Sequence, residues 1–166
     1  MSNRQFSMQT YWERKAAKNI PKLRFGQAYG KFETWHEQAL KGLLELMGEF
    51  PDRVPLCAEV DYSVEEEDFI RERVVFDTEE DMAVPCQVLI PKNARKDHSL
   101  PAILCVHGHG RFGKDPVAGL VSTPEYQADI DLMNYDYGAF MARKGYLTIM
   151  PDLRGFGERR DGDDWL

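Results

Sequence analysis

The spacing of apolar residues in the first third of the chain predicts two helices. Residues 11–19 fit a short helix that Pro21 ends. Thr34-Trp35-His36-Glu37 matches a capping box, in which the Thr hydroxyl accepts an orphan N–H and the Glu reaches back to the cap. Apolar residues then recur at helical spacing as far as Pro51, which predicts a longer helix with one apolar face.

The pattern changes to a period of two after an acid-rich stretch. Residues 51–68 are rich in proline and acid, which indicates a connection. Alternation over residues 70–76 and again over residues 83–90 predicts two strands, and the short polar turn between them predicts an antiparallel hairpin.

The continuous apolar run Ala102–Val106 predicts a third strand, covered on both faces, that ends in a glycine-rich loop. A connection over 115–133, a helix over 135–144 and a strand over 146–150 follow. Such a strand, helix and strand form a right-handed parallel unit, so the loops after the two strands lie at one edge of the sheet. That edge is the expected binding site.

Composition bounds the class of protein. The 166 residues are 43% hydrophobic and 30% charged, with a net charge of −7, as in an ordinary globular domain. No apolar run approaches the roughly 20 residues of a membrane helix, and no secretory h-region is visible. Cys57, Cys86 and Cys105 share no metal-type spacing, which favours free thiols in the cytoplasm.

The charge is distributed unevenly along the chain. The first 31 residues hold seven Lys or Arg and a single acid, Glu13. Aromatic residues are not interleaved densely with these cations, so a solvated basic extension on an acidic body is favoured over nucleic-acid binding. We expect neither a nucleic-acid nor a membrane partner.

The loop after the third predicted strand matches parts of three ligand-binding motifs, and in each case a nearby residue or a missing ligand argues against the match. Gly108-x-Gly110-x-x-Gly113 matches a dinucleotide fingerprint, but Pro116 interrupts the helix that should follow. The same stretch with Lys114 resembles a phosphate loop, yet Asp115 stands where Ser or Thr should bind magnesium. For a metal site, His107-x-His109 lacks the further ligands that a binuclear centre needs. We therefore expect no metal and no cofactor.

Taken together, the hairpin, the strand ending in His107-Gly108 and the strand ending in Pro-Asp152-x-Arg154-Gly-x-Gly resemble the N-terminal half of the α/β-hydrolase superfamily. Within that superfamily the chain is most similar to the dienelactone hydrolase and acetyl-xylan-esterase-like group. The resemblance implies an α/β fold in which residues 65–166 form a partial hydrolase domain with its first four strands. Residues 1–64 form an N-terminal helical extension and connection.

The resemblance also implies roles for the two loops. The backbone N–H of His109 or Gly110 would belong to an oxyanion hole, because the loop after the third strand of this fold supplies one such donor. His107, Gly108 and Arg111 would orient the loop or line the pocket, as would Asp152 and Arg154. Arg111, Lys114 and Arg154 permit an anionic substrate, although solvated surface charge explains them equally well.

The nucleophile of this fold is missing from the 166 residues. No Ser or Cys stands in a G-x-S-x-G elbow, so the nucleophile, acid and histidine are expected outside the chain. The family's strand order places residues 102–106 beside an absent fifth strand, and we expect the rest of the domain or a partner chain to cover that edge. The leading hypothesis is a portion of a serine-type hydrolase of small-molecule esters. The alternatives are a truncated non-catalytic module that binds or assembles and, less favoured, a nucleotide-binding domain built on Gly108–Gly113.

Overall fold

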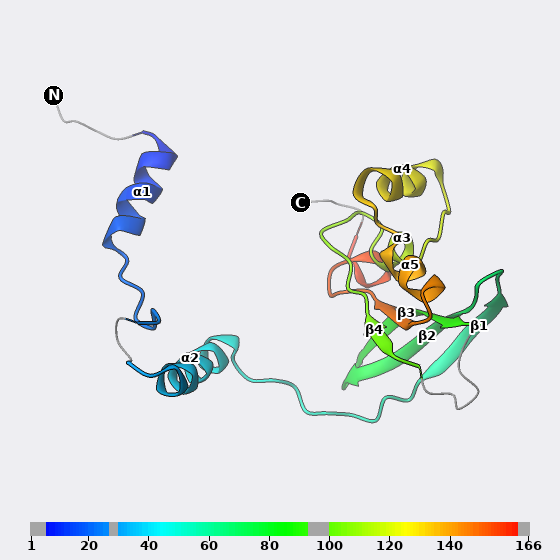
Figure 1. The fold of residues 1–166 in the computed structure, drawn as a ribbon, viewed down its shortest axis with the longest axis horizontal. Helices are drawn as coiled ribbons and strands as arrows, with labels where there is room; N and C mark the ends of the chain where they lie inside the picture. Colours follow the sequence, from blue (N-terminus) through cyan, green and yellow to red (C-terminus); the bar gives the residue numbers. More distant parts are fainter. Residues whose placement is uncertain (1–5, 27–29, 93–99, 163–166) are drawn as a thin grey trace. The chain divides into compact units, whose positions relative to one another are not determined.

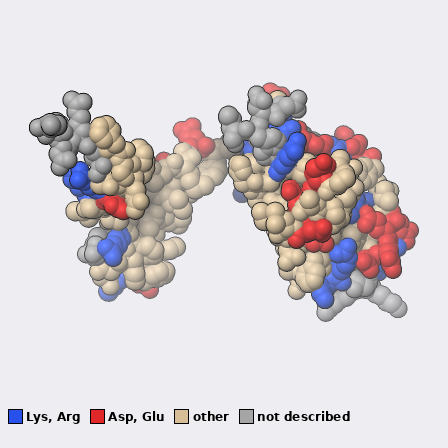
Figure 2. Space-filling view, turned by 90° about the horizontal axis from the view of Figure 1, so that it is seen from above, with Lys and Arg blue, Asp and Glu red and all other residues tan. Residues whose placement is uncertain are grey.

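The computed structural model describes residues 6–26, 30–92 and 100–162. The chain divides into two compact units, Met1–Phe50 and Pro51–Leu166, and each is described by itself (Figure 1). On the face shown in Figure 2, Lys or Arg and acidic side chains appear on both units, and acidic patches are spread over the second.

The first unit contains the two predicted helices, α1 (Met8–Lys18) and α2 (Phe32–Met47). Ser7 caps α1 by accepting the N–H of Thr10. The capping box predicted at Thr34 is wrong: α2 begins at Phe32, after Lys31, and Thr34 lies inside the helix. Phe32 packs against Trp35 with ring centroids 5.7 Å apart, and this aromatic contact accompanies a helix start earlier than the box implied.

The second unit is built on a five-stranded sheet of order β1-β2-β3-β5-β4. The strands are β1 (Glu59–Glu65), β2 (Phe69–Glu79), β3 (Met82–Pro91), β4 (Ala102–Leu104) and β5 (Leu147–Pro151). β2 and β3 form the predicted antiparallel hairpin, and β4 pairs with β5 in parallel. The order β2-β3-β5-β4 places β4 at the edge of the sheet, as the α/β-hydrolase resemblance implied for residues 102–106.

β1 is a strand where the sequence predicted only a connection. It pairs with β2 in antiparallel fashion, with a register shift between Val60 and Tyr62. All seven of its residues are exposed. The acid-rich neighbourhood suggested a solvated loop, yet an edge strand needs no buried face because its backbone pairs with β2 alone.

The stretch predicted as a connection over 115–133 contains two helices. These are α3 (Lys114–Val117) and α4 (Pro124–Met133), and α5 (Tyr137–Arg143) lies within the helix predicted over 135–144. Pro124 is compatible with α4 because it stands in the first turn, where the missing N–H has no helical partner. A single 3₁₀ turn, η1 (Gly157–Arg159), follows β5.

The three helices lie on one face of the sheet (Figure 1), where α3 and α5 contact β3 and β5. This face holds the core: Phe69, Leu89, Cys105, Val117, Ala118, Ala139, Ala142 and Met150. Cys86 and Cys105 are buried free thiols, as predicted, whereas Cys57 is exposed.

β4 lies at the edge of the sheet and is covered on one face only, which corrects the expectation of a strand buried on both. Cys105 packs in the core and His107 against the second loop, and both are buried. Leu104 and Val106 point the opposite way and are 63% and 41% exposed, with no helix over them in the described part of the chain. In the same described ranges, no helix is both long and apolar enough to cross a membrane.

Candidate active-site loops

Two loops meet at the carboxyl edge of the parallel strands β4 and β5. The first loop, His107–Gly113, follows β4, and the second loop, Asp152–Glu158, follows β5. Their contact confirms that both loops emerge on the same side of the sheet, as the parallel unit predicted.

Both ring nitrogens of His107 are bonded to backbone groups, Nε2 to the second loop and Nδ1 within the first loop. Its Nε2 accepts the N–H of Leu153 at 3.0 Å, so the proton lies on Nδ1, which is 2.7 Å from the carbonyl oxygen of Gly108. The side chain is buried, and its ring contacts Phe156 edge-on with centroids 5.2 Å apart. With both nitrogens bonded to backbone groups, His107 is held in one tautomer and one orientation.

The Asp152 side chain contacts both loops. Its fully buried carboxylate accepts three hydrogen bonds: from the Lys114 N–H at 2.9 Å, the Lys114 ammonium at 2.8 Å and the Glu158 N–H at 3.0 Å. Oδ1 also lies 4.0 Å from Nε2 of His107. Asp152 thus fixes the end of the first loop against the end of the second.

Lys114 is buried, with its side chain 1% exposed, and is not a surface charge. Its ammonium contacts Asp152, Glu158 at 2.5 Å and Asp115 at 3.5 Å. Burial opposes the charged form, but these three carboxylates together raise the pKa of Lys114 above its ordinary value. Because it is enclosed by protein carboxylates, Lys114 is not placed to bind a substrate anion.

Glu158 connects the second loop to the sheet. Arg73 on β2 donates to both of its carboxylate oxygens and also pairs with Asp61 on β1. Burial works against the charged carboxylate, yet hydrogen bonds from Arg73 and Lys114 lower the pKa of Glu158. Charges of alternating sign therefore run from β1 to Asp152.

Two glycines leave room for the Asp152 carboxylate. A Cβ at Gly113 would lie 2.3 Å from Oδ1, and one at Gly157 would lie 2.2 Å from the same atom. Both have positive φ, 58° and 53°, which a side chain would strain. The glycine spacing that resembled a nucleotide motif thus serves, at Gly113, to pack the loop on a carboxylate.

The predicted oxyanion-hole residues form a tight turn over Tyr135. The Tyr135 hydroxyl accepts the Gly108 N–H at 2.7 Å, and the Gly110 N–H donates to the Gly108 carbonyl oxygen at 2.8 Å. The His109 N–H has no hydrogen-bond partner among the residues that the structure describes. Of the two predicted donors, His109 is the one whose N–H is not already used.

The remaining predicted residues, Arg111 and Arg154, belong to the two loops but donate no hydrogen bond to the Asp152 carboxylate. Arg154 pairs with Glu79 at the end of β2, and the exposed Arg111 lies over the ring of Phe112 at 5.5 Å. A polar cleft of about 360 Å³ opens beside the loops and contains Arg111. Its full lining is Arg111, Phe112, Asp115, Tyr126, Gly157, Glu158 and Arg160.

The described residues of the loop after β4 form neither the metal site nor the nucleotide site whose motifs they partly match. Within ranges 6–26, 30–92 and 100–162, no three His, Cys, Asp or Glu side chains are grouped to hold a metal ion. The helix after Gly113 has four residues, and the Lys114 amine that a phosphate loop would use is bonded to Asp152 and Glu158. This geometry disfavours the nucleotide-binding alternative.

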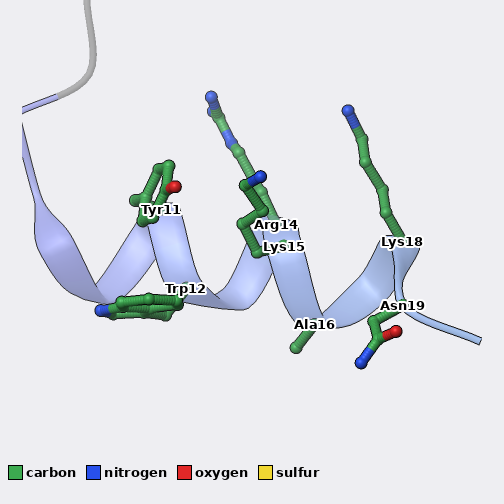
Figure 3. A pocket seen from close by; sticks show the side chains of 7 residues that line it. All are labelled: Tyr11, Trp12, Arg14, Lys15, Ala16, Lys18 and Asn19. Atoms are coloured by element: carbon green, nitrogen blue, oxygen red, sulfur yellow. The ribbon is translucent and has the colours of Figure 1, made fainter. Parts of the chain in front are cut away.

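A second hollow lies in the first unit, along α1. Among the residues that the structure describes, it is lined by that helix and its C-cap alone, and Arg14, Lys15 and Lys18 project to one side while Trp12 lies on another (Figure 3). Because no other described element lines it, the hollow carries no argument for a binding site.

Comparisons with known proteins place this geometry in a family. The chain is 28% identical over 120 residues to a Bacillus subtilis (strain 168) protein named "Putative hydrolase YtaP", an alignment that covers 72% of the chain and 38% of that protein. Its structure matches, with a TM-score of 0.72 and 23% identity, a Bacteroides fragilis NCTC 9343 protein described as a "putative acetyl xylan esterase". This match covers 95% of the chain and 40% of the other, so the chain spans about two fifths of each relative.

The structural match supports an α/β-hydrolase fold, and the sequence model of the abhydrolase family matches residues 3–165, almost the whole chain. The chain belongs to the abhydrolase family.

Proposed function

We propose that this chain is the N-terminal portion of a serine-type ester hydrolase and supplies one donor of its oxyanion hole. The observation that carries the proposal is the His109 N–H, which has no partner within the described ranges and lies in a turn braced by His107 and Tyr135. In this fold the loop after the third strand contributes such a donor, and the residue after the nucleophile contributes the other.

The proposed chemistry is acyl transfer. A serine outside residues 1–166 attacks the ester carbonyl, and the developing oxyanion accepts hydrogen bonds from His109 and from the nucleophile's neighbour. An acid and a histidine, also outside these residues, take the serine proton and return it to the leaving alcohol. His107 does not transfer protons in this scheme, because its Nε2 accepts the N–H of Leu153 in the second loop and its Nδ1 is bonded to the Gly108 carbonyl oxygen in the first loop.

The uncovered side of β4 supports the view that more of the domain packs here. Leu104 and Val106 are exposed, and the outer backbone of β4 pairs with no strand in the described part of the chain. An apolar edge of this kind is a template for pairing with another strand. The proposed occupant is the fifth strand of the same hydrolase domain, supplied by further residues of the protein or by a partner chain.

The test begins with the complete reading frame that contains this sequence. The protein it encodes should carry G-x-S-x-G a few dozen residues beyond Leu166 and should hydrolyse p-nitrophenyl acetate. Residues 1–166 alone should not hydrolyse this ester. A reading frame that lacks such an elbow, or a complete protein without esterase activity, would favour the non-catalytic module instead.

The covering of β4 has its own test. Residues 1–166 expressed alone should self-associate in analytical ultracentrifugation, and Leu104→Lys should reduce this association because a charge on an edge strand opposes pairing. A wild-type fragment that is monomeric and unfolds cooperatively would contradict the proposed covering.

A further inference from the structure

Lys114 has a place in the structure that its sequence position did not indicate. It begins α3 directly after the first loop, 38 residues before Asp152 and 44 before Glu158, both of which its ammonium contacts. Its side chain is 1% exposed, so it touches neither solvent nor a ligand in the adjoining cleft. Neither the proposed oxyanion chemistry nor the abhydrolase match assigns it a role.

The charges around Lys114 are arranged to hold two loops together. Asp152 and Glu158 are the first and last residues of the second loop. Their two carboxylates would repel each other without the ammonium of Lys114 between them. Lys114 is attached to the first loop through Gly113, whose backbone packs against the same carboxylate. The ammonium therefore bonds the end of one loop to both ends of the other.

The first loop depends on this contact for its position relative to the second loop. Asp152 is adjacent to Leu153, whose N–H His107 accepts, and His107 is two residues before His109. A shift of Asp152 thus moves the Leu153 N–H, the His107 ring and, through the turn, the His109 N–H. Arg73 holds the far side of Glu158 on β2, so the assembly is anchored to the sheet.

We propose that Lys114 is a positioning residue, whose buried ammonium clamps Asp152 to Glu158 and thereby sets the orientation of His107 and of the His109 N–H. The proposal rests on the proposed function only for its catalytic consequence, since the clamp itself is a property of these side chains. Lys114 acts through other residues and does not contact the ester.

The clamp predicts a specific change at His107 when the ammonium is removed. In Lys114→Met the Asp152 carboxylate loses the ammonium that donates to its Oδ2, so it is no longer tied to Glu158 through this cation. Asp152 should then shift, and the adjacent Leu153 N–H should lose its hydrogen bond to His107 Nε2. A role in stability alone would lower the melting temperature and leave this hydrogen bond unchanged.

The experiment uses the protein encoded by the complete reading frame, with ¹⁵N-labelled histidine and assignment by His107→Gln. In the wild type, the NMR shift of His107 Nε2 should be that of a nitrogen that accepts a hydrogen bond, from the Leu153 N–H. Lys114→Met should move this shift toward that of a ring nitrogen without the bond, Lys114→Arg should restore the wild-type shift in part, and Lys92→Met should match the wild type. Lys92 is the control because its pair with Glu65 is at the surface.

Kinetics with p-nitrophenyl acetate provide the second readout. Lys114→Met should lower kcat about 100-fold with little change in KM, because a displaced donor is felt mainly in the transition state. An unchanged His107 Nε2 shift in Lys114→Met would overturn the proposal, as would an unchanged kcat in an active enzyme. If Lys114→Met does not fold, Glu158→Gln should show a weaker form of both changes, and wild-type behaviour there would equally overturn it.

The two proposals fail separately. A protein in which Lys114→Met breaks the hydrogen bond at His107 Nε2, but in which the wild type has no esterase activity, would refute the proposed function and leave the clamp intact. An active esterase in which Lys114→Met leaves this hydrogen bond in place would refute the clamp alone.

Discussion

Replacing Asp152 by Asn is the sharpest test of how this edge of the sheet is held together. The carboxylate is fully buried and accepts three hydrogen bonds, two of them from Lys114 and one from the Glu158 N–H. An amide offers a single acceptor oxygen, so its NH₂ faces at least one of these donors whichever way it is turned. The Lys114 ammonium also loses one of its two hydrogen-bonded carboxylates.

The expected cost follows from these contacts. Leaving a buried donor unsatisfied costs about 1–3 kcal/mol, and removing one partner of a buried ion pair costs about 3–5 kcal/mol in total. The residual Glu158 contact, which is partly exposed, reduces the loss toward the lower end. We therefore expect Asp152→Asn to lower the free energy of unfolding by about 3 kcal/mol, a large share of the roughly 5–15 kcal/mol of a typical domain.

Urea denaturation of the complete protein, followed by circular dichroism, measures this change. Asp68→Asn is the matched control, since Asp68 pairs with Arg143 where both side chains are about half exposed, and its loss should cost less than about 1 kcal/mol. If Asp152→Asn proves as mild as Asp68→Asn, the buried contacts do not hold the loops in the way described.

Further predictions concern strain, thiol reactivity and acid stability. Gly157→Ala should destabilise the protein by more than about 1 kcal/mol, and more than Gly155→Ala, because both have positive φ but only the former meets the buried carboxylate; chemical denaturation compares them. Burial raises the pKa of Cys86 to about 11, so iodoacetamide at pH 8 should modify Cys57 in the native protein and Cys86 only after unfolding, as mass spectrometry can show. Burial opposes ionisation of Glu158, but hydrogen bonds from an arginine and a lysine lower its pKa below the ordinary value of 4.5. The stability that Glu158 adds to the folded state is therefore present above pH 4.5 and is lost as the pH falls through the lower pKa of the folded state. In a plot of stability against pH, Glu158→Gln should flatten this decline at acid pH.

The strand pattern was predictable because alternation and apolar runs report directly on pairing and burial. The hairpin of β2 and β3 and the parallel pair of β4 and β5 follow from such patterns. β1 carried the same signal, with Val60, Tyr62 and Val64 at alternate positions, but its acidic neighbours led to a loop prediction. Alternation was the better guide, since an edge strand tolerates exposure on both faces.

The partners of the buried charges could not be predicted. Lys114 and Asp152 are 38 residues apart, and nothing in local composition distinguishes a buried lysine from a solvated one. Their contact depends on β4 and β5 being adjacent and parallel, and on Gly113 and Gly157 leaving space around the carboxylate. The uncovered face of β4 was missed for a related reason, because an apolar run indicates that burial is favourable and does not identify what covers it.

The proposed function requires that these residues serve a serine nucleophile elsewhere in the protein. Labelling the complete protein with a fluorophosphonate probe, followed by peptide mapping, locates that serine. We expect one adduct, on the serine of a G-x-S-x-G motif beyond Leu166, with labelling and ester hydrolysis lost together when that serine is replaced by Ala. An adduct on a serine within residues 1–166, or an active esterase that resists the probe, would contradict it.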